Sequence, residues 1–481
     1  MLIATESQRI EKQSAEFRKE LGLRDLVLMQ ILYVVGLSWV GAAAKLGEQQ
    51  IVFWLLAMAL FYLPQAAVVI YLSRRFPLEG GLYQWAKLGF NNGVAFMVAW
   101  NLWIYAIVLL GAFGIQVSNA VVYAIGPSAA FLGENKAFIS AVTGFLLGAL
   151  VVVSILGLWV GKWVHNIGSI LLLVAFAVLV ALPIVGVIRG TVSAYHPFAV
   201  AAPALTLMNV NIFSKLAVGA LSGFEYPAVL AGETRNPQRT LGRSVMIAAP
   251  VISLMFILGT SSMLALVGRE KVDLVGPIPQ AFRVGLGSLG GVAAVLVPFA
   301  VAAVTARMVA NSSVLFTATT RMPMVAGWDS LMPAWFTRLH PKYKTPVNSI
   351  LFIGACALLF GFAGILGVGE QEAFQMLDNA AGLFYGFTYV VLFAIPLMGL
   401  GLAAERAPAW LRVVAAVGLA TTVLYIGLTV VPIVTVVSRW GYALKISAIA
   451  LGANGLGIAL YLSESRGRGR GIADASPIVN S

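Results

Sequence analysis

Charged residues make up only 10% of this 481-residue chain, whereas hydrophobic residues make up 60%. A soluble domain carries about 25% charged and about 45–50% apolar residues. A chain so poor in charge cannot cover its apolar surface with side chains that face water, so lipid must be the solvent for much of it. The composition therefore excludes an ordinary soluble fold.

Cysteine and histidine are also rare. The single cysteine, Cys356, cannot form a disulfide within the chain or build a cysteine-based metal cluster. His165, His196 and His340 are far apart and match no zinc-binding spacing. Since no clustered nucleophile and base is recognisable either, we expect no metal, no cofactor and no enzymatic activity.

The net charge of +12 is the strongest bias among the few charged residues. In so apolar a chain, we interpret it as Lys- and Arg-rich loops on the inner side of a membrane, and we expect no nucleic-acid partner. If both termini are inside, most of the 31 basic residues fall in the inner segments. We therefore predict a multi-pass protein of the cell (plasma or inner) membrane, with both termini cytoplasmic and lipid around it.

Long apolar runs are abundant. A membrane helix needs about 20 mostly apolar residues. Twelve runs qualify, so the sequence predicts an all-α membrane protein with twelve transmembrane helices, between a cytoplasmic segment at 1–24 and a disordered cytoplasmic tail at 464–481. The predicted spans lie near residues 25–44, 50–73, 92–124, 137–160, 164–188, 208–231, 244–267, 288–318, 347–368, 373–400, 409–431 and 441–463.

Spans one and six each contain glycine and serine at mid-membrane, at residues 35–41 and 219–227. Non-helical backbone survives at that depth only where it lines a cavity or binds something. Interrupted spans in matching positions of two halves are typical of an inverted-repeat transporter with its site at the bilayer midplane. The alternative for each glycine pattern is close helix packing.

Glu225 lies within the second interruption, in a stretch otherwise free of charge from Leu216 to Gly232. An intramembrane carboxylate usually faces a water path or a partner. We expect it at the N-terminus of a half-helix, where the helix dipole favours negative charge or where a neutral carboxyl carries a proton. The alternative is a structural carboxylate bonded to backbone amides.

Other polar residues within spans are less distinctive. Arg307 is expected either to pair with a carboxylate or to extend to the interface. Asn311, Ser312 and Ser313 follow it and are candidates to face a cavity. Lys45 and Asp378 are expected near the outer face, solvated or paired.

Four stretches between residue 17 and residue 346 form a recognisable set of motifs. They are Phe17–Leu26 before span one, Phe76–Trp85 after span two, Ser222–Glu225 with Ala231–Arg239 at span six, and the loop after span eight with Arg321, Trp328–Pro333, His340-Pro341 and Thr345-Pro346. In their order and their positions relative to the spans, these stretches resemble the amino acid–polyamine–organocation (APC) permeases.

The resemblance implies a LeuT-type 5+5 inverted repeat, with repeat one at about 25–188, repeat two at about 208–400 and two extra helices at about 409–463. It implies a substrate carboxylate at the backbone amides of Gly36, Leu37 and Ser38. It also implies a substrate ammonium at carbonyls of span six. The span-six candidates are Ala220, Leu221, Ser222 and Gly223; the candidates for side-chain recognition or gating are Trp103, Tyr105, Phe224 and Asn311.

Two features depart from the family pattern. Many members read Gly-Ser-Gly-Ile-Phe in span one, where this chain has 36–40 as Gly-Leu-Ser-Trp-Val. Proton-coupled members often carry a lysine in the middle of span five, and residues near Leu171 hold none. Exchange, proton coupling through Glu225, and cation (Na⁺) coupling through Ser312 and Ser313 all stay open.

The leading hypothesis is a secondary active amino acid permease that works by alternating access. The alternative within the family is a polyamine or organic amine transporter, although a pocket for a polycation should carry more carboxylates than Glu225 alone. A channel would need a continuous polar pore, which the spans do not show. A non-transporting amino acid receptor with the same fold is a further alternative.

Overall fold

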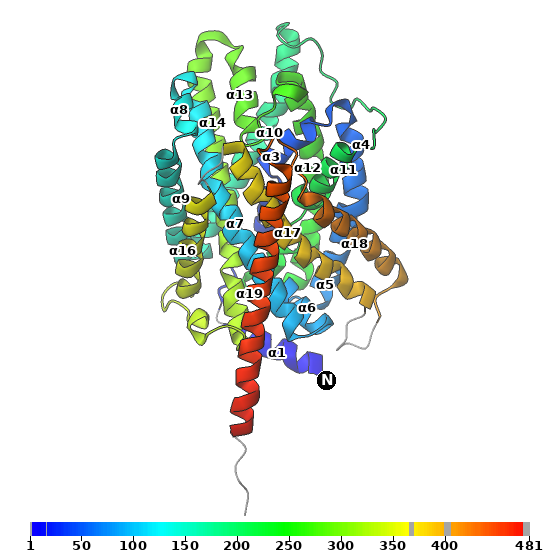
Figure 1. The fold of residues 1–481 in the computed structure, drawn as a ribbon, viewed down its shortest axis with the longest axis vertical. Coiled ribbons are helices and arrows are strands. Elements are labelled where there is room, and N and C mark those ends of the chain that lie inside the picture. The colour runs from blue at the N-terminus through cyan, green and yellow to red at the C-terminus, as the bar shows by residue number, and fades with distance from the viewer. Residues whose placement is uncertain (1, 16, 365–369, 399–405, 475–481) are drawn as a thin grey trace, which may run out of the picture.

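The computed structural model describes the chain except for residues 1, 16, 365–369, 399–405 and 475–481. The described residues form helices and loops without a β-strand, apart from one isolated bridge between Leu21 and Thr234. Figure 1 shows most of the long helices running lengthwise in one elongated bundle. The N-terminal helix α1 (Leu2–Ser14) and the C-terminal end of α19 lie at the same end of it.

Nine continuous helices in the described part of the chain are long and apolar enough to cross a membrane, and one bent pair makes a tenth. The chain is thus an all-helical, multi-pass membrane protein. Spans two to five correspond to α4, η2 and α5 (Gln50–Ala57, Met58–Tyr62, Leu63–Arg75), α7 (Asn92–Ile125), α9 (Lys136–Leu156) and α10 (Leu158–Ile188). Spans seven to twelve correspond to α12 (Pro237–Leu266), α14 (Ala293–Thr319), α16 (Val347–Gly364), α17 (Glu370–Met398), α18 (Ala409–Thr429) and α19 (Arg439–Asp474).

Some predicted ends differ from the structure. The apolar helix of span nine is shorter than a standard crossing, and the predicted residues 365–368 lie outside the described ones. The last two predicted residues of span ten, 399 and 400, are also outside them. Helix α19 continues to Asp474, into the segment predicted as a disordered tail.

The predicted interruptions in spans one and six are confirmed. Span one consists of α2 (Leu23–Val34) and α3 (Leu37–Ala44), which meet at a bend of 44°. Span six consists of α11 (Leu207–Ser214), the π-helical segment η4 (Lys215–Ala220) and, after a turn, the 3₁₀ segment η5 (Tyr226–Glu233). Pi-helical turns often occur at functional sites.

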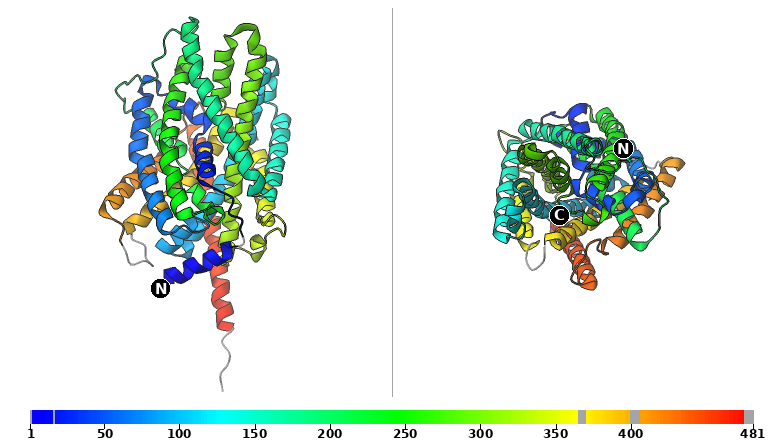
Figure 2. Two further views of the ribbon diagram at one scale, coloured as in Figure 1. Left: turned by 180° about the vertical axis from the view of Figure 1, so that it is seen from behind. Right: turned by 90° about the horizontal axis from the view of Figure 1, so that it is seen from above.

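Short helices connect the long ones: η1 (Gly47–Gln49), α6 (Leu82–Gly89), η3 (Pro127–Ala129), α8 (Ala130–Gly133), η6 (Arg269–Lys271), α13 (Pro277–Gly287), η7 (Gly290–Val292), α15 (Arg321–Trp328) and η8 (Ala334–Thr337). The long helix α7 is central, since it packs on α14, α16 and α17. The last two helices, α18 and α19, lie at the periphery in the end-on view of Figure 2.

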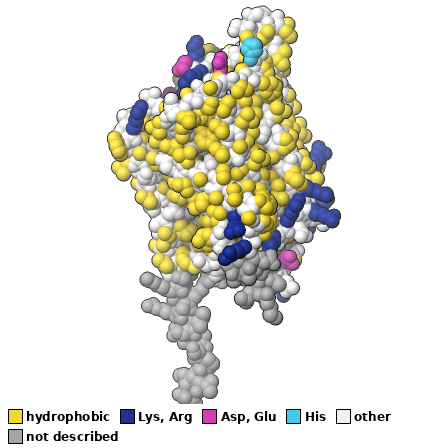
Figure 3. Space-filling model, turned by 90° about the vertical axis from the view of Figure 1, so that its right-hand side faces the viewer, with side chains coloured by type: hydrophobic (Ala, Val, Ile, Leu, Met, Phe, Trp, Pro, Cys, Tyr) yellow, Lys and Arg dark blue, Asp and Glu magenta, His cyan; other side chains and the backbone are white. Residues whose placement is uncertain are grey.

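The surface agrees with a lipid environment. On the side drawn in Figure 3, hydrophobic side chains cover the middle of the molecule and charged ones gather toward its two ends. Many large hydrophobic residues on the outside are exposed, among them Phe145, Ile188 and Phe299. An exposed apolar belt of this kind needs lipid as its solvent.

Candidate functional site

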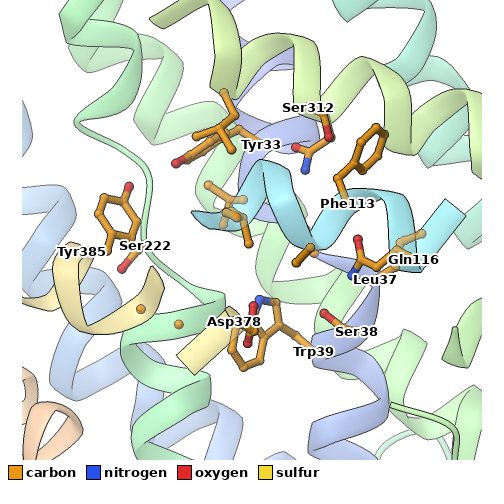
Figure 4. A pocket seen from close by; sticks show the side chains of 18 of the residues that line it. Tyr33, Leu37, Ser38, Trp39, Phe113, Gln116, Ser222, Ser312, Asp378 and Tyr385 are labelled. Atoms are coloured by element: carbon orange, nitrogen blue, oxygen red, sulfur yellow. The ribbon is translucent and has the colours of Figure 1, made fainter. Parts of the chain in front are cut away.

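A cavity of about 110 Å³ lies where the two interrupted spans meet. Residues 36–39 of the first break line one part of the cavity wall, and Val218, Gly219 and Ser222 of the second break line another. Helices α7, α14, α17 and α18 close the other sides (Figure 4). The lining from these helices includes Tyr105, Phe113, Gln116, Arg307, Asn311, Ser312, Phe374, Asp378, Tyr385 and Tyr425.

The first break begins where α2 ends at Val34 and Gly36 takes an extended conformation before α3. The first N–H groups of α3 have no partner within the helix. At the end of α2, the carbonyls of Ile31 and Val34 accept hydrogen bonds from the N–H groups of Val35 and Gly36. Arg307 of α14 fills the carbonyl side, because its guanidinium donates hydrogen bonds to the carbonyls of Leu32 (3.1 Å) and Val35. Arg307 is 3% exposed, so it neither reaches the interface nor pairs with a carboxylate in the described residues.

Trp39 lies between the two breaks. A methyl group added at Gly36 would come within 2.5 Å of one end of the Trp39 indole, and one added at Gly219 within 2.5 Å of the other end. The indole therefore extends from the first break to the second, and both positions need glycine for it to fit. Trp39 also lines the cavity.

The second break turns at Gly223, whose φ of +130° suits glycine. A side chain there would also meet the ring of Tyr33 at 2.6 Å. The Gly223 N–H donates to the hydroxyl of Tyr389 at 2.9 Å, so a side chain of α17 satisfies the freed backbone group.

Glu225 directly precedes η5, at the end of this turn. It is 1% exposed and does not line the cavity. Its carboxylate accepts hydrogen bonds from the hydroxyls of Tyr385 and Tyr389 and from Gln65 at 3.3 Å. Tyr385 itself lines the cavity, so one hydroxyl separates the Glu225 carboxylate from it.

Asp378 of α17 lines the cavity. Lys215 of η4 is its charged neighbour, but the Lys215 ammonium donates to Asn379 at 2.8 Å. Asp378 has no hydrogen bond or ion pair among the described residues. The cavity wall thus contains a carboxylate that no protein donor occupies.

The candidate residues from the sequence divide into two sets. Those that line the cavity are Gly36, Leu37, Ser38, Tyr105, Ser222, Asn311 and Ser312. Those outside its lining are Ala220, Leu221, Gly223, Trp103, Phe224, Glu225 and Ser313. Trp103 stacks on Phe352, and Phe224 stacks on Tyr62. Ser313 contacts His165 at 3.2 Å.

Several lining residues escaped sequence reasoning, above all Trp39, Asp378 and the tyrosines of α17 and α18. Asp378 lies close to the start of its predicted span, which placed it near a membrane surface. The residue types carried no other signal, because aromatic side chains are common in membrane helices. No group of three or more candidate metal ligands gathers anywhere in the described ranges.

A second polar region lies at the end of the molecule that carries α1. Asp329, which follows α15, accepts hydrogen bonds from Arg9, from Lys87 at 2.7 Å and from Tyr83 at 2.6 Å. Burial alone would raise the pKa of the Asp329 carboxyl, but the hydrogen bonds from Lys87 and Tyr83 and the Lys87 charge hold it below its ordinary value. The N-terminal segment is thereby tied to α6 and α15.

Two more acidic residues join the same end to span six. Arg321 donates to Glu233 at 2.8 and 3.0 Å. Glu79 accepts from the Gly232 N–H at 2.6 Å. Burial, together with the nearby charge of Glu233, raises the pKa of Glu79 to about 8. Contacts among the N-terminal segment, α6, η5 and α15 therefore hold this end together.

The chain is similar in sequence to known transporters. The model of the family described as amino acid permease matches residues 21–452. The chain is similar to an uncharacterized transporter of Legionella pneumophila, with 24% identity over 78% of this chain and 80% of the relative. It is also similar to the methylthioribose transporter of Bacillus subtilis, with 24% identity over 76% of this chain and 78% of the relative. A third similar protein is the low-affinity putrescine importer of Escherichia coli K12, with 26% identity over 72% of this chain and 75% of the relative. The match extends over most of the sequence and includes both breaks, and the chain therefore belongs to the amino acid permease family of APC transporters.

Proposed function

We propose that this protein is a secondary active transporter for amino acids that works by alternating access. The substrate binds in the cavity between the breaks of spans one and six. The observation that carries the proposal is that one cavity is lined by both interruptions. The free N–H groups at the start of α3 suit a substrate carboxylate. Organic amines are the second candidate, favoured by Asp378 in the cavity wall and by the putrescine importer among the relatives.

The proposal includes a topology of twelve spans in a 5+5 inverted repeat plus two extra helices, with both termini cytoplasmic. Its support is that the two breaks fall in the first and sixth spans and that α1 and the end of α19 lie at one end of the bundle. An even number of crossings brings both termini to the same side.

For coupling, we propose protons or exchange in preference to a free metal cation. The carbonyls of Leu32 and Val35 at the first break are where the unwound backbone of a transporter would hold Na⁺. In this protein they already accept hydrogen bonds from Arg307. Ser313 contacts His165, and Glu225 is joined to the cavity through Tyr385.

The test is uptake of labelled amino acids and amines into proteoliposomes, with and without a pH gradient, Na⁺ or internal substrate. Saturable uptake supports a carrier, and uptake that needs internal substrate identifies an exchanger. Specific binding without flux under every condition would contradict the proposal and favour a receptor.

A matched pair of glycine variants ties the flux to the cavity. Gly219→Ala places a methyl group 2.5 Å from the Trp39 indole, whereas Gly148→Ala on α9 meets nothing within 4 Å. We expect the first variant to lower uptake strongly and the second to leave it unchanged. Equal uptake by both would place the substrate path elsewhere.

A further inference from the structure

Among the described residues, Asp378 differs from the carboxylates of Glu225, Glu79 and Asp329 in having no hydrogen-bond donor. Glu225, Glu79 and Asp329 each accept at least one hydrogen bond. Asp378 has none among the described residues, although it is only partly exposed and opens to the cavity. In the view of Figure 4 it lies toward Ser38 and Trp39, across the cavity from Ser312.

The nearby positive charge of Lys215 stabilises the Asp378 carboxylate without bonding to it. Lys215 is its charged neighbour, but no ion pair joins the two side chains in the described residues. The Lys215 ammonium is bonded to Asn379, and Asn379 in turn donates to Tyr442 at 2.6 Å. An ionised carboxylate that is only partly exposed and has no protein donor is incompletely solvated, and a cationic group that enters the cavity would stabilise it.

The rest of the wall suits the same kind of group. Aromatic rings surround the cavity, contributed by Tyr33, Trp39, Tyr105, Phe113, Phe374, Tyr385 and Tyr425. The faces of such rings attract alkylammonium groups, and the attraction grows where water is excluded. A carboxylate among aromatic rings is therefore a recognition element for a protonated amine.

We propose that Asp378 binds the ammonium group of the transported solute and restricts the substrate to organic amines, amino acids included. The inference rests on the proposed function. It assigns binding of the substrate ammonium to a side chain of α17, whereas the family resemblance implied the carbonyls of span six. A neutral solute of similar size leaves the Asp378 carboxylate without a partner and is excluded for that reason. Arg307 adds positive charge to the same wall, so a monocation or zwitterion fits better than a dication.

The experiment measures radioligand binding to the purified full-length protein. The probes are the twenty amino acids, butylamine, putrescine and, as a neutral solute, methylthioribose. Asp378→Asn keeps the shape of the side chain and removes its charge. A hydrogen bond to a charged group is strong enough that its loss should weaken ammonium binding by about 10–100-fold. Asp273→Asn is the matched control, because Asp273 accepts from Tyr123 at 2.9 Å and lies outside the cavity lining.

For a second variant we expect tighter ammonium binding, a change that misfolding would not produce. Lys215→Gln keeps a donor for Asn379 but removes the positive charge near Asp378, so ammonium binding should tighten by about threefold or more. If Asp378→Asn does not fold, this variant alone decides. Binding that stays the same or weakens in Lys215→Gln then overturns the proposal.

The outcomes separate the inference from the function on which it rests. Weaker binding of butylamine, with amino acid binding unchanged, in Asp378→Asn supports a site selective for simple amines, and equal weakening of an amino acid supports recognition of its α-ammonium. Unchanged binding of ammonium probes by folded Asp378→Asn, or wild-type selectivity for methylthioribose, overturns the inference while uptake still supports a transporter. Absence of uptake of every probe by wild type removes the proposed function itself.

Discussion

At the break of span one, backbone carbonyl groups lack partners within a helix, and the Arg307 guanidinium of α14 donates hydrogen bonds to two of them. At the break of span six it exposes the Gly223 N–H, and the Tyr389 hydroxyl pairs with that group beside the Glu225 carboxylate. The end of one half-helix carries partial negative charge and the start of another carries partial positive charge. The two breaks are therefore completed by side chains of opposite character.

In both breaks, a freed backbone group is paired by a side chain from another helix. In each case the side chain comes from a helix that follows the break in sequence, α14 for the first break and α17 for the second. Trp39 then joins the breaks through two glycines. Substitutions in these partners should separate what each break contributes to stability and to transport.

The largest effect is expected at the first break. Arg307→Ala leaves the Leu32 and Val35 carbonyls without a donor, at a cost of about 1–3 kcal/mol for each buried group. We expect uptake to fall at least about tenfold and the melting temperature in detergent to drop. Arg307→Lys keeps one cation and should lie between this variant and wild type. Wild-type uptake and melting in Arg307→Ala would show that the first break needs no cation.

The second break should respond through coupling more than through binding. Glu225→Gln keeps the size of the side chain but cannot carry a proton in the same way, so uptake driven by a pH gradient should fall by about tenfold. Exchange without a gradient should change less. Tyr385→Phe is the control that keeps the carboxylate and removes one donor. A gradient response preserved in Glu225→Gln would assign proton coupling to another residue.

A smaller effect is expected at the end that carries α1. Asp329→Asn removes the charged acceptor of three donors, whereas Arg9→Ala removes one partly exposed donor and leaves Lys87 and Tyr83 in place. The Asp329 side chain is 4% exposed and that of Arg9 is 40% exposed, and exposed ion pairs contribute little. We therefore expect a drop in melting temperature of roughly 1–3 °C for Asp329→Asn and less for Arg9→Ala. The reverse order would mean that α1 is held mainly by Arg9.

The smallest effect concerns pH. The pKa of Glu79 is raised to about 8 in the folded protein from an ordinary value of 4.5. Between those values the folded state keeps a proton that the unfolded state releases, so stability is complete below about pH 4.5 and is lost as pH rises toward 8. Glu79→Gln should reduce the fall in melting temperature between pH 5 and pH 8 by roughly 1–2 °C. Parallel pH curves for the two proteins would contradict the raised pKa.

The fold class and the interruptions were within reach of the sequence. Low charge and long apolar runs require lipid as the solvent. A membrane helix can be recognised in the sequence because its apolar residues form one continuous run. The breaks at Gly36 and Gly223 were visible for the same reason. The motif at Ser222–Glu225 pointed to the family, and the match over 21–452 bears this out. Twelve spans, the repeat and the inner position of the termini remain predictions.

The cavity wall was decided by the tertiary structure. Trp39 meets Gly219, Arg307 meets the Val35 carbonyl, and Asp378 opens into the cavity beside residues of span one, all across long stretches of sequence. Hydropathy reports how deep a residue lies but not which way its helix is turned, and it located Asp378 near a membrane surface. The sequence by itself indicated that two membrane helices break and roughly where. Only the packing of α14 and α17 against them decided which side chains complete the breaks and which carboxylate stays free, because those contacts depend on the rotation of each helix about its axis.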